Sequence, residues 1–168
     1  EVLDLLGEGD VVTHCYNNKV NGLIREGKVI SEAREAIKRG VLFDIGHGSE
    51  SFSLDTAEDG IKEGFEADMI STDLYERNMI TPVGSLENTM NKMIYLGWSV
   101  EKCVEKVTYE PARAFKLKGL GELKEGYMGD LTIFDIVENG KLELKDSVNK
   151  VITAEKYIKT KYVFIKDE

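Results

Sequence analysis

The sequence predicts an α/β fold in which parallel strands alternate with helices, followed by a smaller β-rich part. Short apolar runs at residues 10–15, 41–45 and 69–72 each precede a polar loop and then a helical pattern. Repeated strand–loop–helix units are typical of a parallel sheet. After residue 117 the pattern changes to short strands separated by turns. An apolar fraction of 42% supplies enough side chains for a core in 168 residues.

The first two units can be followed residue by residue. The strand at 10–15 leads into a polar loop at 16–30, which is longer than the usual connection of about 4–6 residues. Long loops of this kind often carry function. A serine then opens a helix at 31–39, and the second strand follows at 41–45. An Asp-x-x-Glu spacing indicates a capping box for a helix at 55–64.

The third unit contains several helices. The strand at 69–72 is followed by a loop at 73–84 and by helices at 85–96 and 99–108, each beginning with a serine suited to an N-cap. A proline in the first turn favours a further short helix at 111–115.

The C-terminal segment is expected to be β-rich. The apolar runs 131–137 and 142–144 flank Asn139-Gly140, and Asn-Gly between two such runs predicts a hairpin. Further strands are predicted at 151–153 and 158–165. The change of pattern therefore predicts two domains, residues 1–118 and residues 119–168.

The charge and cysteine content limit the partners. Lys and Arg number 22 and Asp and Glu number 31, which gives a net charge of −9. No basic patch for nucleic acid or an anionic membrane is visible, and no apolar run approaches the roughly 18–20 residues that span a bilayer. Cys15 and Cys103 form neither a metal-type pair nor a disulfide framework. We expect a reducing, cytoplasmic setting.

The two histidines of the chain and one aspartate close the three predicted strands. His14, His47 and Asp73 are separated by 33 and 26 residues, the size of a βαβ repeat. All three are therefore expected at one edge of the sheet, where α/β folds place their chemistry. Imidazole and carboxylate are ligands of catalytic divalent metals. A single strand-end histidine is more often structural, but three such groups together favour a metal site.

Several other residues near these strand ends each allow two interpretations. Tyr16 and Asn17 are candidates for substrate contact, and a solvated loop is the alternative. Gly46 and Gly48 let the backbone approach a ligand closely, or simply form a tight turn. Asp44 either orients a neighbouring side chain or is a satisfied buried carboxylate, and we favour the second reading.

The amino-acid sequence of these motifs resembles that of the dihydroorotase-like and deacetylase-like branch of the amidohydrolase superfamily. Residues 9–17 and 43–48 are similar to its fifth and sixth barrel strands, and residues 69–73 to its eighth. Residues 107–113 and 129–135 are similar to its closing helix and its return into a small β domain. The resemblance implies the C-terminal half of a (β/α)8 (TIM) barrel with a small C-terminal β domain.

The resemblance also implies roles for the strand-end residues. His14 and His47 would bind the second metal of a binuclear centre, with zinc the expected ion. Asp73 would bind the first metal and act as general base. A bound metal activates water and polarises the scissile carbonyl of a small-molecule substrate, and the carboxylate moves the proton. Gly48, Tyr16 and Asn17 remain the candidates for substrate contact.

The chain departs from the family pattern at two places. The family's first-strand His-x-His pair and fourth-strand carboxylated lysine have no counterpart here. We therefore expect a fragment of a metal-dependent hydrolase of amide or ester bonds that is inactive alone. The alternative is a non-catalytic structural or interaction module. Half a barrel leaves strand edges open, which predicts a homo-oligomer or pairing with the missing N-terminal half.

Overall fold

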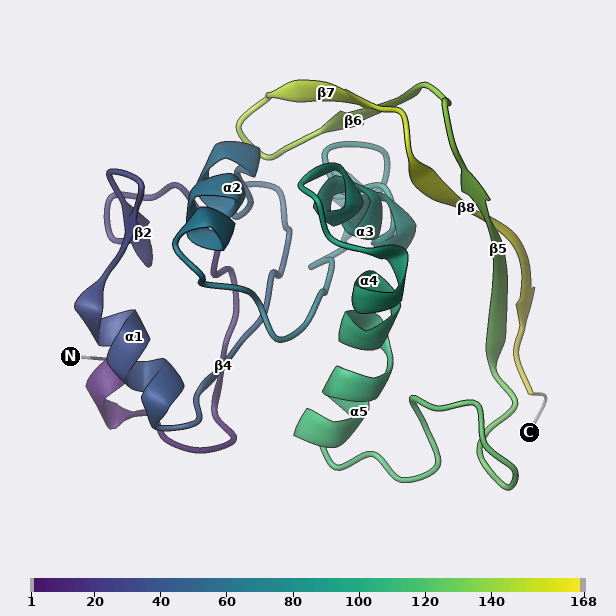
Figure 1. The fold of residues 1–168 in the computed structure, drawn as a ribbon, viewed down its shortest axis with the longest axis horizontal. Helices are drawn as coiled ribbons and strands as arrows, with labels where there is room; N and C mark the ends of the chain where they lie inside the picture. The colour runs from purple at the N-terminus through teal and green to yellow at the C-terminus, as the bar shows by residue number, and fades with distance from the viewer. Residues whose placement is uncertain (1, 167–168) are drawn as a thin grey trace.

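The computed structural model describes residues 2–166, with helices in the middle of the molecule and at its N-terminal side and the C-terminal strands over the top and at the other side (Figure 1). The helices are the 3-10 turns η1 (Leu3–Leu5) and η2 (Glu76–Asn78) and the α-helices α1 (Ser31–Lys38), α2 (Leu54–Lys62), α3 (Leu86–Tyr95), α4 (Val100–Val107) and α5 (Tyr109–Ala114). The strands are β1 (Val11–Val12), β2 (Ile24–Arg25), β3 (Lys28–Val29), β4 (Leu42–Phe43), β5 (Leu131–Val137), β6 (Leu142–Lys145), β7 (Val151–Ala154) and β8 (Tyr157–Phe164).

The three predicted parallel strands lie side by side. β1 pairs with β4 in parallel. A parallel bridge joins Asp44 to Met69, and the Gly48 amide donates to the Thr72 carbonyl at 3.0 Å, so residues 69–72 run along the extension of β4. The resemblance left room for a further strand between these two, but they are in direct contact.

Aromatic side chains pack around β4 in the buried core. Phe43 of β4 meets Phe65 edge to face at 5.0 Å, and Tyr16 meets Phe65 at 6.1 Å between ring centroids. The serine caps predicted for the helices now numbered α3 and α4 are confirmed, because the side chains of Ser85 and Ser99 accept backbone amides. The cap of α2 is Ser53 rather than the predicted Asp55, which lies in the first turn instead.

The long loop at 16–30 contains a small hairpin that the sequence did not reveal. β2 and β3 are two residues each and pair antiparallel, with Ile24 opposite Val29. Gly27 makes the turn with φ +75°, a conformation that glycine adopts at little cost. Two-residue strands are too short to show an alternating pattern.

The C-terminal strands form one long bent ribbon rather than the predicted hairpin. β5 pairs with β8, and β6 pairs with β7, both antiparallel. The expected pairing of residues 131–137 with 142–144 is therefore wrong. Asn139-Gly140 marks the bend, where the Gly140 amide donates to the Glu155 carbonyl, and the ribbon turns back at 146–150. Figure 1 shows β6 and β7 crossing above α2 and α3, and β5 and β8 descending beside α4 and α5.

The ribbon shares its core with the helices. Leu144, Ile152 and Ile158 belong to the same buried cluster as the side chains around β4. The predicted boundary at 118 lies in a segment without regular structure between α5 and β5. None of the helices between residues 2 and 166 has the length and apolar character that crossing a bilayer requires.

Candidate active site at the carboxyl edge

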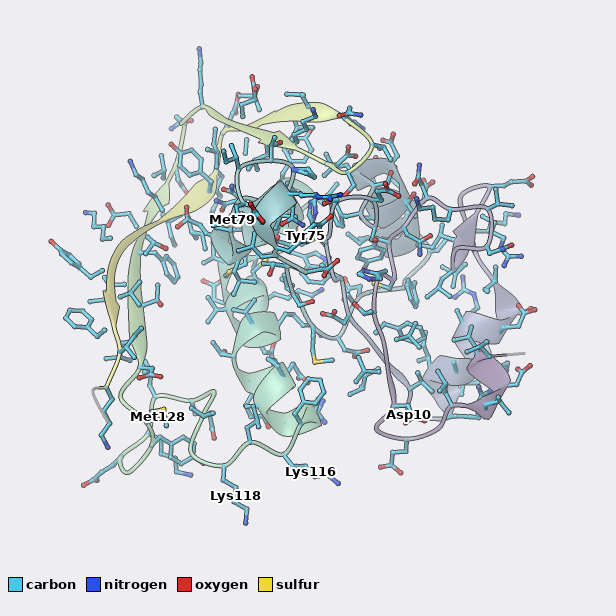
Figure 2. All side chains as sticks on the ribbon, turned by 180° about the vertical axis from the view of Figure 1, so that it is seen from behind. Asp10, Tyr75, Met79, Lys116, Lys118 and Met128 are labelled. Carbon is cyan, nitrogen blue, oxygen red and sulfur yellow. The ribbon has the colours of Figure 1, made fainter. Side chains whose placement is uncertain are left out.

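Parallel pairing brings the carboxyl ends of three strands to one edge of the sheet. We call this edge, made of residues 13–14, 46–48 and 71–73, the carboxyl edge. Asp10 lies just before β1, at the amino end of the strands, and Tyr75 lies just beyond residues 71–73; Figure 2 labels both, with Tyr75 near the middle of the molecule and Asp10 below it. The edge is therefore the place where ligands bind in α/β folds.

A short glycine turn lies between His14 and Asp73. A Cβ atom on Gly46 would lie 2.7 Å from His14 Nδ1, and one on Gly48 would lie 2.7 Å from Asp73 Oδ2. Because two residues span at most about 7 Å, His14 and Asp73 flank a single short segment. Only glycine leaves room for both side chains.

The backbone at this turn is strained on both sides. His14 has φ 63° and Asp73 has φ 48°, in the left-handed region that costs L-residues about 1–2 kcal/mol. Such strain concentrates at functional sites. His14 Nδ1 donates to the Gly46 carbonyl at 2.5 Å, which leaves the lone pair of the ring on Nε2. Asn78 Nδ2 donates to the Asp73 carbonyl at 2.9 Å, and the Asp73 side chain is exposed.

The His47 ring packs inside the chain, which differs from the expectation that it binds metal. The ring is fully buried and stacks on Phe52 with centroids 4.6 Å apart. Its Nδ1 donates to the Gly48 carbonyl at 2.9 Å, and its Nε2 accepts from Lys92 Nζ at 2.8 Å. Burial, reinforced by the charge of Lys92, lowers the pKa of His47 to about 3. Both ring nitrogens are thus engaged inside the chain.

Two of the three residues predicted to contact substrate, Tyr16 and Asn17, make hydrogen bonds within the chain. Tyr16 is fully buried; its hydroxyl donates to the Phe65 carbonyl at 3.1 Å and accepts from the Ala67 amide at 2.9 Å. Asn17 holds its own loop, because Nδ2 donates to the His14 carbonyl at 2.7 Å and Oδ1 accepts from the Lys19 amide at 3.0 Å. Gly48 lies against the Asp73 side chain, whereas the contacts of Asn17 with His14 are to its backbone carbonyl.

Asp44 links all three strands beneath the carboxyl edge. Its Oδ2 accepts from Thr13 Oγ1 at 2.7 Å and from Ser71 Oγ at 2.6 Å. The other carboxylate oxygen, Oδ1, is buried without a hydrogen-bond partner in the described residues. Asp44 is therefore a buried carboxylate that is only half satisfied, and not the fully satisfied one that the sequence favoured.

The donor types at the carboxyl edge fit a divalent metal, but their number is insufficient. His14 offers an imidazole nitrogen and Asp73 a carboxylate, whereas a catalytic zinc normally has three protein ligands. Between residues 2 and 166 no group of three or more His, Cys, Asp or Glu side chains is arranged to hold a metal ion. The described residues therefore do not form a complete metal site.

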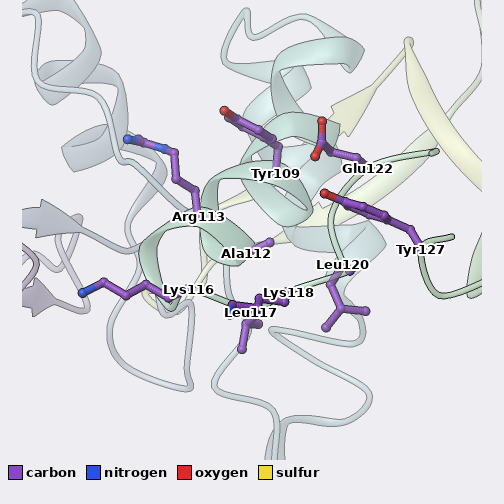
Figure 3. A pocket seen from close by; sticks show the side chains of 10 residues that line it. Tyr109, Ala112, Arg113, Lys116, Leu117, Lys118, Leu120, Glu122 and Tyr127 are labelled. Atoms are coloured by element: carbon purple, nitrogen blue, oxygen red, sulfur yellow. The ribbon is translucent and has the colours of Figure 1, made fainter. Parts of the chain in front are cut away.

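A cavity also opens elsewhere in the molecule. An open cavity of about 550 Å³ is formed by α5 and the segment after it, including Tyr109, Lys118 and Tyr127 (Figure 3). Lys116 and Lys118 lie at the end of the molecule away from Tyr75 (Figure 2). Because Tyr75 is next to the carboxyl edge, the cavity does not serve the candidate site.

Lys92 is the residue near the site that sequence reasoning missed. It is on α3 and only 1% exposed, with Nζ 2.8 Å from His47 Nε2 and 2.6 Å from the Pro82 carbonyl. Burial lowers its pKa to about 7, although the charge of Asp146 acts in the opposite direction. The available signal was position, because Lys92 falls among the buried residues of its helix, but a lysine there is normally read as exposed.

Known proteins resemble this chain along most of its length. The sequence pattern of the amidohydrolase family matches residues 26–168. A deacetylase of Enterococcus faecalis is 45% identical over 139 residues, which cover 81% of this chain and 38% of that protein. A deacetylase of Agrobacterium fabrum is 39% identical over 166 residues, covering 98% of this chain and 40% of that protein.

Two crystal structures share the fold closely. One, described as an adenine deaminase, has a TM-score of 0.93 and 40% identity; the other, described as a dihydroorotase, has a TM-score of 0.87 and 37% identity. Each match covers 98% of this chain and 45% of the solved chain. The chain thus spans about two-fifths of the curated relatives and under half of the solved structures, which is consistent with a partial barrel.

Proposed function

Because the chain belongs to the amidohydrolase family, we propose that it forms the C-terminal part of a metal-dependent hydrolase that cleaves an amide or ester bond. The observation that carries this proposal is the placement of His14 and Asp73 on the two sides of the Gly46–Gly48 turn at the carboxyl edge. The remaining metal ligands would come from residues outside this chain.

The proposed roles follow from the side-chain atoms at the carboxyl edge for which we found no hydrogen bond within the described residues. His14 Nε2 and the Asp73 carboxylate are the ligand candidates, and Asp73 also accepts the proton released by the attacking water. A bound divalent ion, zinc by preference, would lower the pKa of that water and polarise the carbonyl. His47 has no ligand role in this proposal.

The relatives favour an acyl group as the part of the substrate that is removed. Both curated relatives described above are named deacetylases, so we propose an acetylated small molecule as substrate. The solved structures are described as a deaminase and a dihydroorotase, which makes adenine and dihydroorotate the appropriate competing substrates in an assay.

The experiment that tests this proposal adds a second polypeptide to provide the remaining metal ligands. We would co-express residues 1–168 with the part of the Enterococcus faecalis deacetylase that this chain does not match, load zinc, and measure acetate release from N-acetyl and O-acetyl compounds. We expect hydrolysis by the complex, none by the chain alone, and a loss of about 10²–10⁴-fold for Asp73→Asn.

The matched control is Asp10→Asn, which makes the same change at the opposite end of the sheet (Figure 2) and should retain activity. An assembled, zinc-loaded complex without hydrolytic activity would favour the non-catalytic module instead. Undiminished activity of Asp73→Asn in an active complex would remove the proposed role of Asp73.

A further inference from the structure

The buried amine of Lys92 holds together two segments that are distant in sequence. It bonds His47, 45 residues earlier, and the carbonyl of Pro82, ten residues earlier. Burying an amine is costly unless its hydrogens find acceptors. Here two acceptors are present, and an amine can supply two N–H bonds whether it is protonated or neutral.

The first of these segments, which contains His47, contacts Asp73 and its neighbour Thr72 through Gly48. The His47 ring is fixed by Lys92 on one nitrogen and by the Gly48 carbonyl on the other. Gly48 in turn donates its amide to Thr72, the neighbour of Asp73, at 3.0 Å. It also lies so close to the Asp73 carboxylate that a Cβ atom would be 2.7 Å from Oδ2.

The second segment is the loop that begins at Asp73. Near its start, the fully buried Asn78 donates to the Asp73 carbonyl and accepts from the Tyr75 amide at 2.8 Å. At its far end, the Pro82 carbonyl accepts from Lys92 at 2.6 Å. The loop is therefore held at both ends, and Lys92 provides the far attachment.

We propose that Lys92 is a positioning residue for Asp73, because its amine fixes both the His47–Gly48 segment and the Pro82 end of the loop that carries Asp73. The inference rests on the proposed function, in which Asp73 binds metal and accepts a proton. Lys92 does not touch the reacting atoms in this arrangement. It determines where the Asp73 carboxylate lies.

The first test needs no catalysis. In the 168-residue chain we would record amide and imidazole NMR spectra of Lys92→Met, Lys92→Gln and the control Lys102→Met. Lys102 is a lysine of α4 whose Nζ lies 4.5 Å from the Trp98 ring centroid and pairs with Glu66. We expect Lys92→Met to lose the protected Hδ1 signal of His47 and to shift the Gly48 and Asp73 amides. Lys92→Gln, which keeps a donor, should restore part of both signals.

The second test uses the zinc-loaded complex described above. A misplaced catalytic group can lower the rate by about 100-fold, so Lys92→Met should reduce kcat far more than it changes KM, while Lys102→Met leaves both unchanged. A folded Lys92→Met with Gly48 and Asp73 amide signals in their original positions would overturn the inference. If Lys92→Met does not fold, His47→Gln must give the same amide shifts. If Lys92→Met shifts the Gly48 and Asp73 amides but the wild-type complex is inactive, the structural connection from Lys92 to Asp73 stands and the proposed function is rejected.

Discussion

Gly48 is a residue at which a single added methyl group would disturb the geometry of the site. Gly48→Ala should lose about 1–2 kcal/mol of unfolding free energy from its φ of +55° alone. It should lose more because the new Cβ would meet the Asp73 carboxylate. Gly64→Ala is the matched control, since Gly64 has φ +73° but open space around it. Urea denaturation of both variants measures the difference; equal losses would show that the Asp73 contact is not a close one.

The buried His47 predicts a loss of stability in acid. Its pKa is about 3 in the folded chain and 6.5 as the ordinary value. Between these values the unfolded chain binds a proton that the folded chain does not. The unfolding free energy should therefore fall as the pH drops from 6.5 toward 3, by up to about 1.4 kcal/mol per pH unit. His47→Gln should flatten this slope in urea titrations and His14→Gln should not; identical slopes for all three proteins would contradict the prediction.

The lowered pKa of Lys92 affects the unfolding free energy at the alkaline end of the pH profile. Burial lowers its pKa to about 7 from 10.5, so between these values the unfolded chain holds a proton that the folded chain has released. Stability should rise as the pH increases from 7 toward 10.5. Lys92→Met should lack this rise, and its stability relative to wild type should be greatest at or below pH 7. Thermal melts across this range, with Lys102→Met as control, measure the effect; a Lys92→Met profile parallel to wild type would exclude it.

At the scale of elements, one carboxylate connects the C-terminal ribbon to α2. Asp146 is 1% exposed and accepts from the Leu54 amide at 3.0 Å, as well as from the amides of Val148 and Lys150. Asp146→Ala would leave the buried Leu54 amide without its acceptor, at about 1–3 kcal/mol. Asp130→Ala removes a single exposed bond to the Lys166 amide and should cost far less. Comparable unfolding midpoints for the two variants would contradict this role of Asp146.

The elements that the sequence predicted well are those with strong local signals. Ser85 and Ser99 mark helix starts because a hydroxyl cap is a local interaction. The pairing of β5 with β8 is not local, and Asn139-Gly140 serves a bend as readily as a hairpin turn. Local pattern therefore identified the strands but not their partners.

The candidate site was predictable in part for the same reason. The positions of His14 and Asp73 follow from two strand ends, which periodicity reveals. The direction of the His47 ring depends on Lys92, 45 positions away on another element. A histidine between two glycines has the same local sequence whether it faces a metal or a helix, so only the packed structure distinguishes the two.

At the scale of the whole molecule, the outer part of the C-terminal ribbon leaves apolar side chains uncovered. Those between 40% and 61% exposed on β5 and β8 are Leu131, Ile133, Ile136, Tyr162, Val163 and Phe164. Apolar surface gathered in this way usually marks an interface. We predict that the chain associates with a second copy, or with the remainder of a barrel when that is supplied. Light scattering tests this; a concentration-independent monomer of 18.9 kDa would be evidence against a dimer.

The Asp146 contact also bears on the order in which the chain assembles. The hydrogen bonds of Asp44 close loops of only 31 and 27 residues, whereas those of Asn91 to Ile158 and of Leu54 to Asp146 close loops of 67 and 92. Longer closures add little to the equilibrium cost, about 0.6 kcal/mol per doubling, but distant contacts form more slowly. The three strands should therefore come together early, while the N-terminal amide of α2 waits for a carboxylate that is synthesised 92 residues later.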